Sequence, residues 1–218
     1  MGDRIIPLPE DKEKKKDLDI LEFLGKLEWL RDAELENQKP FDTTKLRTPH
    51  IFFVMFQGAK YALSLHGTAI LMGFLILIFT FVSKIFFYLS FLIEILLLLI
   101  KIAFPIYVIR SFVIWENSLM TKLVENFVLG YSLTSFVVDM ISLLLSFIAF
   151  VFLKILSVYP QFQGITEVGF LFFNEKTAII WFINVICDFI PIFYFHIYKK
   201  QKKFHVPRWT PLDEIPEN

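Results

Sequence analysis

The sequence has a single cysteine, Cys187, among its 218 residues, so no disulfide can form within the chain. It also lacks an excess of positive charge, because 22 Lys and Arg residues balance 22 Asp and Glu residues. Proteins that bind nucleic acid use a basic surface to neutralise phosphates. We therefore predict that nucleic acid is not a partner.

Motifs that carry enzyme chemistry are missing as well. The sequence has no Gly-rich phosphate loop, no Gly-x-Ser-x-Gly, no His-Glu-x-x-His and no cysteine cluster. Asp139 and Asp188 lie in Val-Val-Asp-Met and Ile-Cys-Asp-Phe, not in the Gly-x-Gly-Asp context of intramembrane aspartyl proteases. We predict a protein that is not an enzyme and that holds no cofactor and no metal.

Apolar residues, by contrast, are in excess. Hydrophobic residues make up 56% of the chain, and Phe alone accounts for 27 residues. Soluble domains contain about 45–50% apolar residues, and a membrane-spanning helix needs about 20 in succession. The sequence predicts an all-α polytopic membrane protein, a four-helix antiparallel transmembrane bundle with spans at about 62–82, 85–109, 127–151 and 177–198.

These spans divide the chain into an N-terminal region, a membrane domain and a polar tail, at residues 1–50, 51–198 and 199–218. Residues 51–59 are too few to cross, and we expect them to lie at the membrane interface. The Phe-rich loop 159–176 is expected to lie along the membrane surface. Because no strong apolar run occurs before residue 51, we expect no cleaved signal peptide.

Orientation follows from the Lys and Arg residues near the span ends. An N-terminus inside the cell puts nine of them at cytoplasmic flanks and three at the opposite side. The sequence therefore predicts an integral membrane protein with both termini cytoplasmic. The nine are Lys45, Arg47, Lys60, Arg110, Lys122, Lys199, Lys200, Lys202 and Lys203, and the three are Lys84, Lys154 and Lys176.

Residues 17–36 have the pattern of an amphipathic helix. Its polar face carries seven acidic residues against Lys26 and Arg31, whereas helices that lie on membranes usually have a basic polar face. We predict that its apolar stripe binds a partner protein; the alternative is a helix packed on the chain's own spans. The predicted contact residues are Ile20, Leu24, Leu27 and Leu30.

Small and polar residues fall on one face of the third span. Burial of Leu does not drive helices together in lipid, whereas close packing of small residues and interhelical hydrogen bonds do. The seam consists of Ser132, Ser135, Asp139, Ser142, Ser146 and Ala149, at steps of three and four. Span one has a weaker seam that includes His66 and Gly73. These seams predict helix packing, or alternatively a polar pathway at the same axis.

Four charged residues lie within the spans and form a predicted intramembrane polar cluster: Glu94, Lys101, Asp139 and Asp188. Each charge at the centre of a span costs roughly 2.5–3.5 kcal/mol. Glu94 and Lys101 share a helix face about 10 Å apart, so each is expected to meet Asp139 or Asp188. Three acids face one base, which predicts that at least one acid is protonated or binds a cation.

The stretch from His66 to Gly73, His-Gly-Thr-Ala-Ile-Leu-Met-Gly, resembles the start of the first span in the lysosome-associated four-transmembrane (LAPTM-like) family. The spacing between spans three and four is also similar. The resemblance implies four spans, cytoplasmic termini and an adaptor role in endosomal and lysosomal membranes. The chain departs from that pattern in its first outside loop, which is only Ser83-Lys84, and in a tail without Pro-Pro-x-Tyr.

Two functions are consistent with these features. The first is a non-enzymatic membrane scaffold, adaptor or accessory subunit that contacts lipid and other membrane or cytoplasmic proteins, or further copies of itself. The alternative is a subunit of a proton- or cation-conducting transporter or channel that uses the intramembrane acids. The two differ in whether the acids pair with one another inside the chain.

Overall fold

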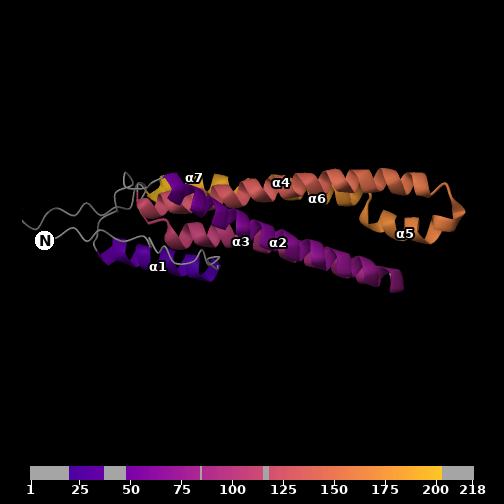
Figure 1. The fold of residues 1–218 in the computed structure, drawn as a ribbon, viewed down its shortest axis with the longest axis horizontal. Helices are drawn as coiled ribbons and strands as arrows, with labels where there is room; N and C mark the ends of the chain where they lie inside the picture. Colours follow the sequence, from indigo (N-terminus) through magenta and orange to yellow (C-terminus); the bar gives the residue numbers. More distant parts are fainter. Residues whose placement is uncertain (1–19, 37–47, 84, 115–117, 203–218) are drawn as a thin grey trace, which may run out of the picture.

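A computed structural model describes residues 20–36, 48–83, 85–114 and 118–202 of the chain (Figure 1). The described residues form helices and no strand. Residues 1–19, 37–47, 84, 115–117 and 203–218 lie outside them, and with them most of both terminal regions. The elements are α1 (Ile20–Glu36), α2 (Thr48–Val82), α3 (Ile85–Phe112), α4 (Leu119–Leu156), the 3₁₀ turn η2 (Pro160–Phe162), α5 (Gln163–Phe172), α6 (Glu175–Cys187) and α7 (Ile190–Lys202).

Four helical stretches are long and apolar enough to cross a membrane. We call them the first to fourth crossings: Ile51–Val82, Ile85–Phe112, Leu119–Leu156 and Pro160–Lys200. The prediction of an all-helical, multi-pass integral membrane protein is confirmed at this level. Figure 1 shows α2 and α4 running away from the α1 end of the molecule, and α3 and α6–α7 returning to it.

The first crossing begins earlier than its predicted start at residue 62. Residues 51–59, expected as a separate interfacial segment, form the early turns of α2. Gln57 and Gly58, which interrupt the apolar run, are buried, and Gly58 faces α4. At 35 residues, α2 is about 52 Å long and therefore exceeds the roughly 30 Å of a hydrocarbon core.

The most extensive helix contact joins α2 to α4. Two glycines make it close. A Cβ on Gly58 would overlap the carbonyl oxygen of Phe127 and lie 2.9 Å from the Tyr131 nitrogen. A Cβ on Gly130 would lie 2.8 Å from Met55 Cα and overlap the Met55 carbonyl. The two backbones therefore touch where neither helix carries a side chain, which is the packing mode that membranes favour.

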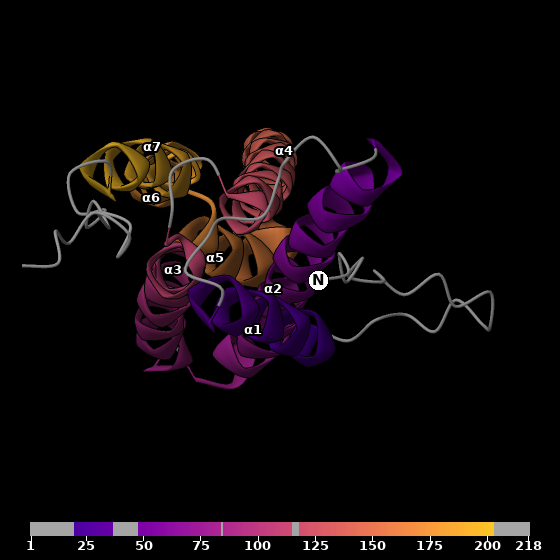
Figure 2. The ribbon, with the colours of Figure 1, turned by 90° about the vertical axis from the view of Figure 1, so that its left-hand side faces the viewer.

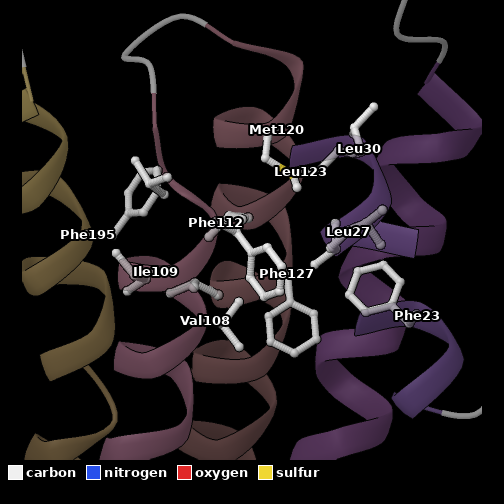
Figure 3. Packing of buried hydrophobic residues seen from close by; sticks show 14 residues of the cluster. Phe23, Leu27, Leu30, Val108, Ile109, Phe112, Met120, Leu123, Phe127 and Phe195 are labelled. Atoms are coloured by element: carbon white, nitrogen blue, oxygen red, sulfur yellow. The ribbon is translucent and has the colours of Figure 1, made fainter. Parts of the chain in front are cut away.

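A hydrophobic core fills the α1 end (Figure 3). Phe23, Leu27 and Leu30 of α1 insert into it, and the Phe23 ring stacks on Phe127 at 5.5 Å. Leu24 packs at its edge, whereas the side chain of Ile20 lies outside the described part. The apolar stripe of α1 is thus buried against the chain's own α3 and α4. This is the alternative arrangement that the sequence left open, and it leaves the predicted partner-binding residues largely covered.

The opposite half of the molecule is packed much less tightly. Buried residues of α4 lie between Met120 and Ser135, with Leu153 as the exception. Beyond Ser135 the α4 surface is largely exposed and apolar, as a lipid-facing surface must be. At this end α5 packs on α4, where Leu153 meets Gly169, and reaches α3 through Phe172 and Phe87, whose rings lie 5.4 Å apart.

Figure 2 views the molecule from the α1 end, with α1 beside α2 and α3.

The fourth crossing is broken, whereas the sequence predicts one continuous span at 177–198. Helix α6 ends at Cys187, Asp188 and Phe189 form a turn, and α7 starts at Ile190. Pro191 explains the break, because proline has no N–H to donate to the carbonyl four residues earlier and its ring clashes with that carbonyl. Non-helical backbone at membrane depth is tolerated only where protein or water surrounds it, and Asp188 is 1% exposed.

Candidate functional site

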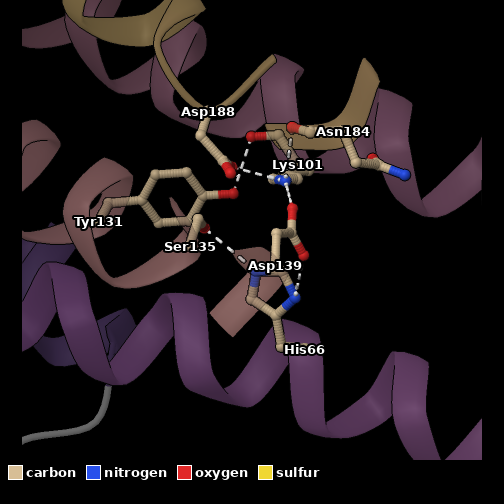
Figure 4. Close-up of polar contacts among 7 residues, drawn as sticks. All are labelled: His66, Lys101, Tyr131, Ser135, Asp139, Asn184 and Asp188. Atoms are coloured by element: carbon tan, nitrogen blue, oxygen red, sulfur yellow. Dashed lines mark hydrogen bonds and ion pairs between the residues drawn. The ribbon is translucent and has the colours of Figure 1, made fainter. Parts of the chain in front are cut away.

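The centre of the site is the ammonium group of Lys101 on α3, a side chain that is 5% exposed. It pairs with the carboxylate of Asp139 on α4 and lies 2.5 Å from Oδ1 of Asp188 at the break (Figure 4). Lys101 Nζ also donates to the carbonyl oxygen of Asn184 on α6, at 3.3 Å. One cation therefore joins the second, third and fourth crossings.

His66 of α2 adds the first crossing. Its Nδ1 lies 3.4 Å from Asp139 Oδ1, and its Nε2 lies 3.2 Å from the Ser135 hydroxyl oxygen. A neutral imidazole suits both contacts when Nδ1–H donates to Asp139 and Nε2 accepts from Ser135. We call His66, Lys101, Asp139 and Asp188 the ion network; it receives one side chain from each crossing.

Two prolines help to build the network. Pro105 leaves the carbonyl of Lys101, four residues earlier, without its helical partner. The Tyr131 hydroxyl of α4 donates to that carbonyl at 2.8 Å. Pro191 causes the break that carries Asp188. Such freed backbone groups in membrane helices are commonly satisfied by side chains of neighbouring helices.

The helix ends at the break also favour these charges. Asn184 lies in the last turn of α6, where the helix dipole is negative, and its carbonyl faces the Lys101 cation. Asp188 directly precedes the N-terminal end of α7, where the dipole is positive. Both helix ends therefore stabilise the charge nearest to them.

The network lies deep within the crossings. Asp139 is fourteen residues from Glu125 and fifteen from Lys154 along α4, which is roughly 21 Å and 22 Å. With His66 neutral, two carboxylates and one ammonium leave a net charge of −1. An uncompensated charge at such depth is costly, so the network has room for one further positive charge.

Glu94, the fourth member of the predicted cluster, lies apart. It is exposed, and it makes no hydrogen bond or ion pair within the described ranges. Among the described residues of α3, the buried side chains lie between Lys101 and Phe112. Glu94 is two turns beyond that packed section, so sharing a face with Lys101 does not bring it to the network.

The serine seam is divided in the same way. Ser132 and Ser135 are buried, and Ser135 contacts His66 of α2. Ser142 and Ser146 are half-buried, and the Ser146 hydroxyl donates to the Ser142 carbonyl at 3.0 Å. The first part of the seam is therefore buried. In the second part, the Ser146 hydroxyl is satisfied within α4 and not by another helix.

Tyr131 is a site residue that the sequence did not point to; it contributes through its hydroxyl, and the spacing of Pro105 from Lys101 was the available signal. Asn184 shares a polar stripe of the fourth span with Asp188, and it contributes through its backbone carbonyl. In the part of the chain that the structure describes, no group of three His, Cys, Asp or Glu side chains is placed to hold a metal ion.

Comparison with protein-family models, curated proteins and solved structures finds no match to the chain. The resemblance of residues 66–73 to the lysosome-associated four-transmembrane family stays a prediction.

Proposed function

We propose that the protein is a non-enzymatic integral membrane scaffold or accessory subunit, built as an antiparallel four-helix bundle with both ends in the cytoplasm. The observation that carries the proposal is the pairing of Lys101 with carboxylates from two other crossings. Intramembrane charges that pair across helices can hold those helices in register without a transported ion.

The docked position of α1 supports the same proposal. With its apolar stripe buried, α1 presents Trp29, which is 59% exposed, together with acidic side chains such as Glu28 and Asp32. An exposed Trp on a charged helix at the rim of a bundle is a suitable anchor for a partner protein. In this proposal the partner contacts the outward face of α1, because Leu27 and Leu30 pack in the chain's own core.

Orientation can be tested by cysteine labelling in a Cys187→Ser background. Lys122 and Gln161 are both exposed. Lys122 lies in the first turn of α4, and Gln161 lies in η2, just beyond the other end of α4. We expect a membrane-impermeant maleimide added outside intact cells to label Gln161→Cys and to spare Lys122→Cys until the membrane is opened. Labelling of Lys122→Cys from outside would contradict cytoplasmic termini.

A second candidate is a subunit that conducts protons or cations. It is favoured by the break in the fourth crossing, because transporters commonly place their ion sites at interrupted helices near the bilayer midplane. Asp188 lies at such an interruption and belongs to the ion network.

Proteoliposomes loaded with a pH-sensitive dye distinguish the two functions. For a scaffold, a pH gradient should decay at the same rate with the wild-type protein, with Asp188→Asn and with empty vesicles. Affinity purification in mild detergent should in addition retain a stoichiometric membrane protein, with Trp29→Ala weakening that association. Decay that requires the protein and is abolished by Asp188→Asn would support conduction and overturn the scaffold.

A further inference from the structure

Asp188 is the least satisfied member of the ion network. Its side chain is completely buried, and neither carboxylate oxygen accepts a well-directed hydrogen bond from a described residue. Oδ1 has the ion pair with Lys101 at 2.5 Å, whereas Oδ2 has no ion pair there. A buried ionised carboxylate whose oxygen has no donor is costly. Protonation lowers this cost because a neutral carboxyl is much cheaper to bury than a charged one.

The other members of the network are already satisfied. Asp139 uses one oxygen for Lys101 and the other for His66. His66 has a partner at each ring nitrogen as a neutral imidazole. The remaining ionisable groups near Asp188 in the described part of the chain are Tyr131 and Cys187, which are neutral in their ordinary state and supply no positive charge. Among these described groups, only Lys101 offsets the two carboxylates.

We propose that Asp188 is an exchangeable proton-binding site, which takes up one proton per chain and brings the buried network to zero net charge. The proton is held on the carboxylate oxygen that has no donor. This inference does not depend on the scaffold function, because a proton can be bound without being conducted.

Proton binding changes how the break is held. When Asp188 is ionised, it and Asp139 share the Lys101 ammonium, so the α6–α7 turn is tied to α3 by an ion pair. When Asp188 is protonated, Lys101 keeps Asp139 as its counter-ion and that tie is weakened. Acid therefore loosens the attachment of the break to α3, and alkali restores it, which makes the break a proton-responsive hinge.

The test is infrared difference spectroscopy of the full chain in lipid nanodiscs, titrated from acid to alkaline pH across neutrality. We expect one carbonyl-stretch band of a protonated carboxyl, shifted by deuterium oxide, which disappears on titration to alkaline pH. Asp188→Asn should abolish it, and so should Asp139→Asn, because the loss of one carboxylate leaves Lys101 and Asp188 as a neutral pair. Glu94→Gln, which removes the acid outside the network, should leave the band unchanged.

Circular dichroism and gel filtration of each variant establish that it is folded. His66→Gln keeps both aspartates and removes the imidazole, so the carboxyl band should persist in this variant. If the aspartate variants do not fold, the proposal is still tested by comparing the carboxyl band of the wild type with that of Glu94→Gln. A band that Glu94→Gln removes would overturn the proposal, as would the lack of any titrating carboxyl band in the wild type. Uptake of the proton by His66, visible as an imidazolium in nitrogen-15 spectra without a carboxyl band, would overturn it too.

Discussion

Gly130→Ala is expected to separate α2 from α4 and to lower the free energy of unfolding by roughly 3 kcal/mol or more. Overpacking of a tight interface typically costs about 1–3 kcal/mol, and this site is at the severe end. The new Cβ would meet backbone atoms of Met55, at 2.7 Å from its carbonyl carbon. Backbone cannot move aside as a flexible side chain can. Reversible unfolding in mixed micelles, followed by circular dichroism, measures the change.

Gly73→Ala is the matched control for that substitution. It lies on α2, the helix that Gly130 of α4 contacts, and a Cβ there would have no atom of another helix within 4 Å. Because Ala is favoured over Gly in a helix interior by up to about 1 kcal/mol, this variant should be neutral or slightly stabilised. Equal effects of Gly130→Ala and Gly73→Ala would mean that the α2–α4 contact is not the close one described.

Lys101→Met is expected to have the second large effect, because it removes the one cation that two buried carboxylates share. Breaking a buried ion pair by removing one partner typically costs roughly 3–5 kcal/mol. The loss should be greatest at alkaline pH, where the proposed proton has left Asp188, and smaller in acid, where a protonated Asp188 no longer repels Asp139. The same unfolding measurement, repeated across pH, tests this.

A triple variant supplies the control. Lys101→Met combined with Asp139→Asn and Asp188→Asn removes every formal charge at the centre of the network and retains similar shapes. We expect it to recover most of the stability lost in Lys101→Met alone, since replacing a whole buried ionic group by uncharged residues is often neutral. Failure of the triple variant to recover would mean that Lys101 acts through packing of its stem.

Hydropathy is sufficient to predict the four crossings, because lipid permits only long apolar helices with satisfied backbones. It does not predict which glycine meets another helix. Gly73 lies on a predicted packing seam, yet a Cβ there would meet no other helix, whereas Gly58 and Gly130, which no seam included, lie where α2 and α4 touch. Helix rotation decides this, and rotation depends on both partners together.

The charged residues illustrate the same limit. Glu94 and Lys101 share a face of α3, so periodicity treats them alike, yet only Lys101 lies where helices converge. The break in the fourth crossing was, by contrast, within reach of the sequence. Pro191 lies inside the predicted span, and the loss of helical bonding four residues before a proline is a local rule. Lys101, which pairs with Asp188 in the resulting turn, is eighty-seven residues away in the chain. No local sequence rule predicts a contact at that separation.

The docking of α1 also has a consequence for synthesis of the chain. Phe23 stacks on Phe127, which is made 104 residues later. At a translation rate of about 5–20 residues per second, Phe23, Leu27 and Leu30 wait roughly 5–20 s for their binding surface. During that interval the stripe is uncovered on the nascent chain, available to a chaperone or to premature association. A ribosome that stalls before α4 would leave it uncovered for as long as the stall lasts.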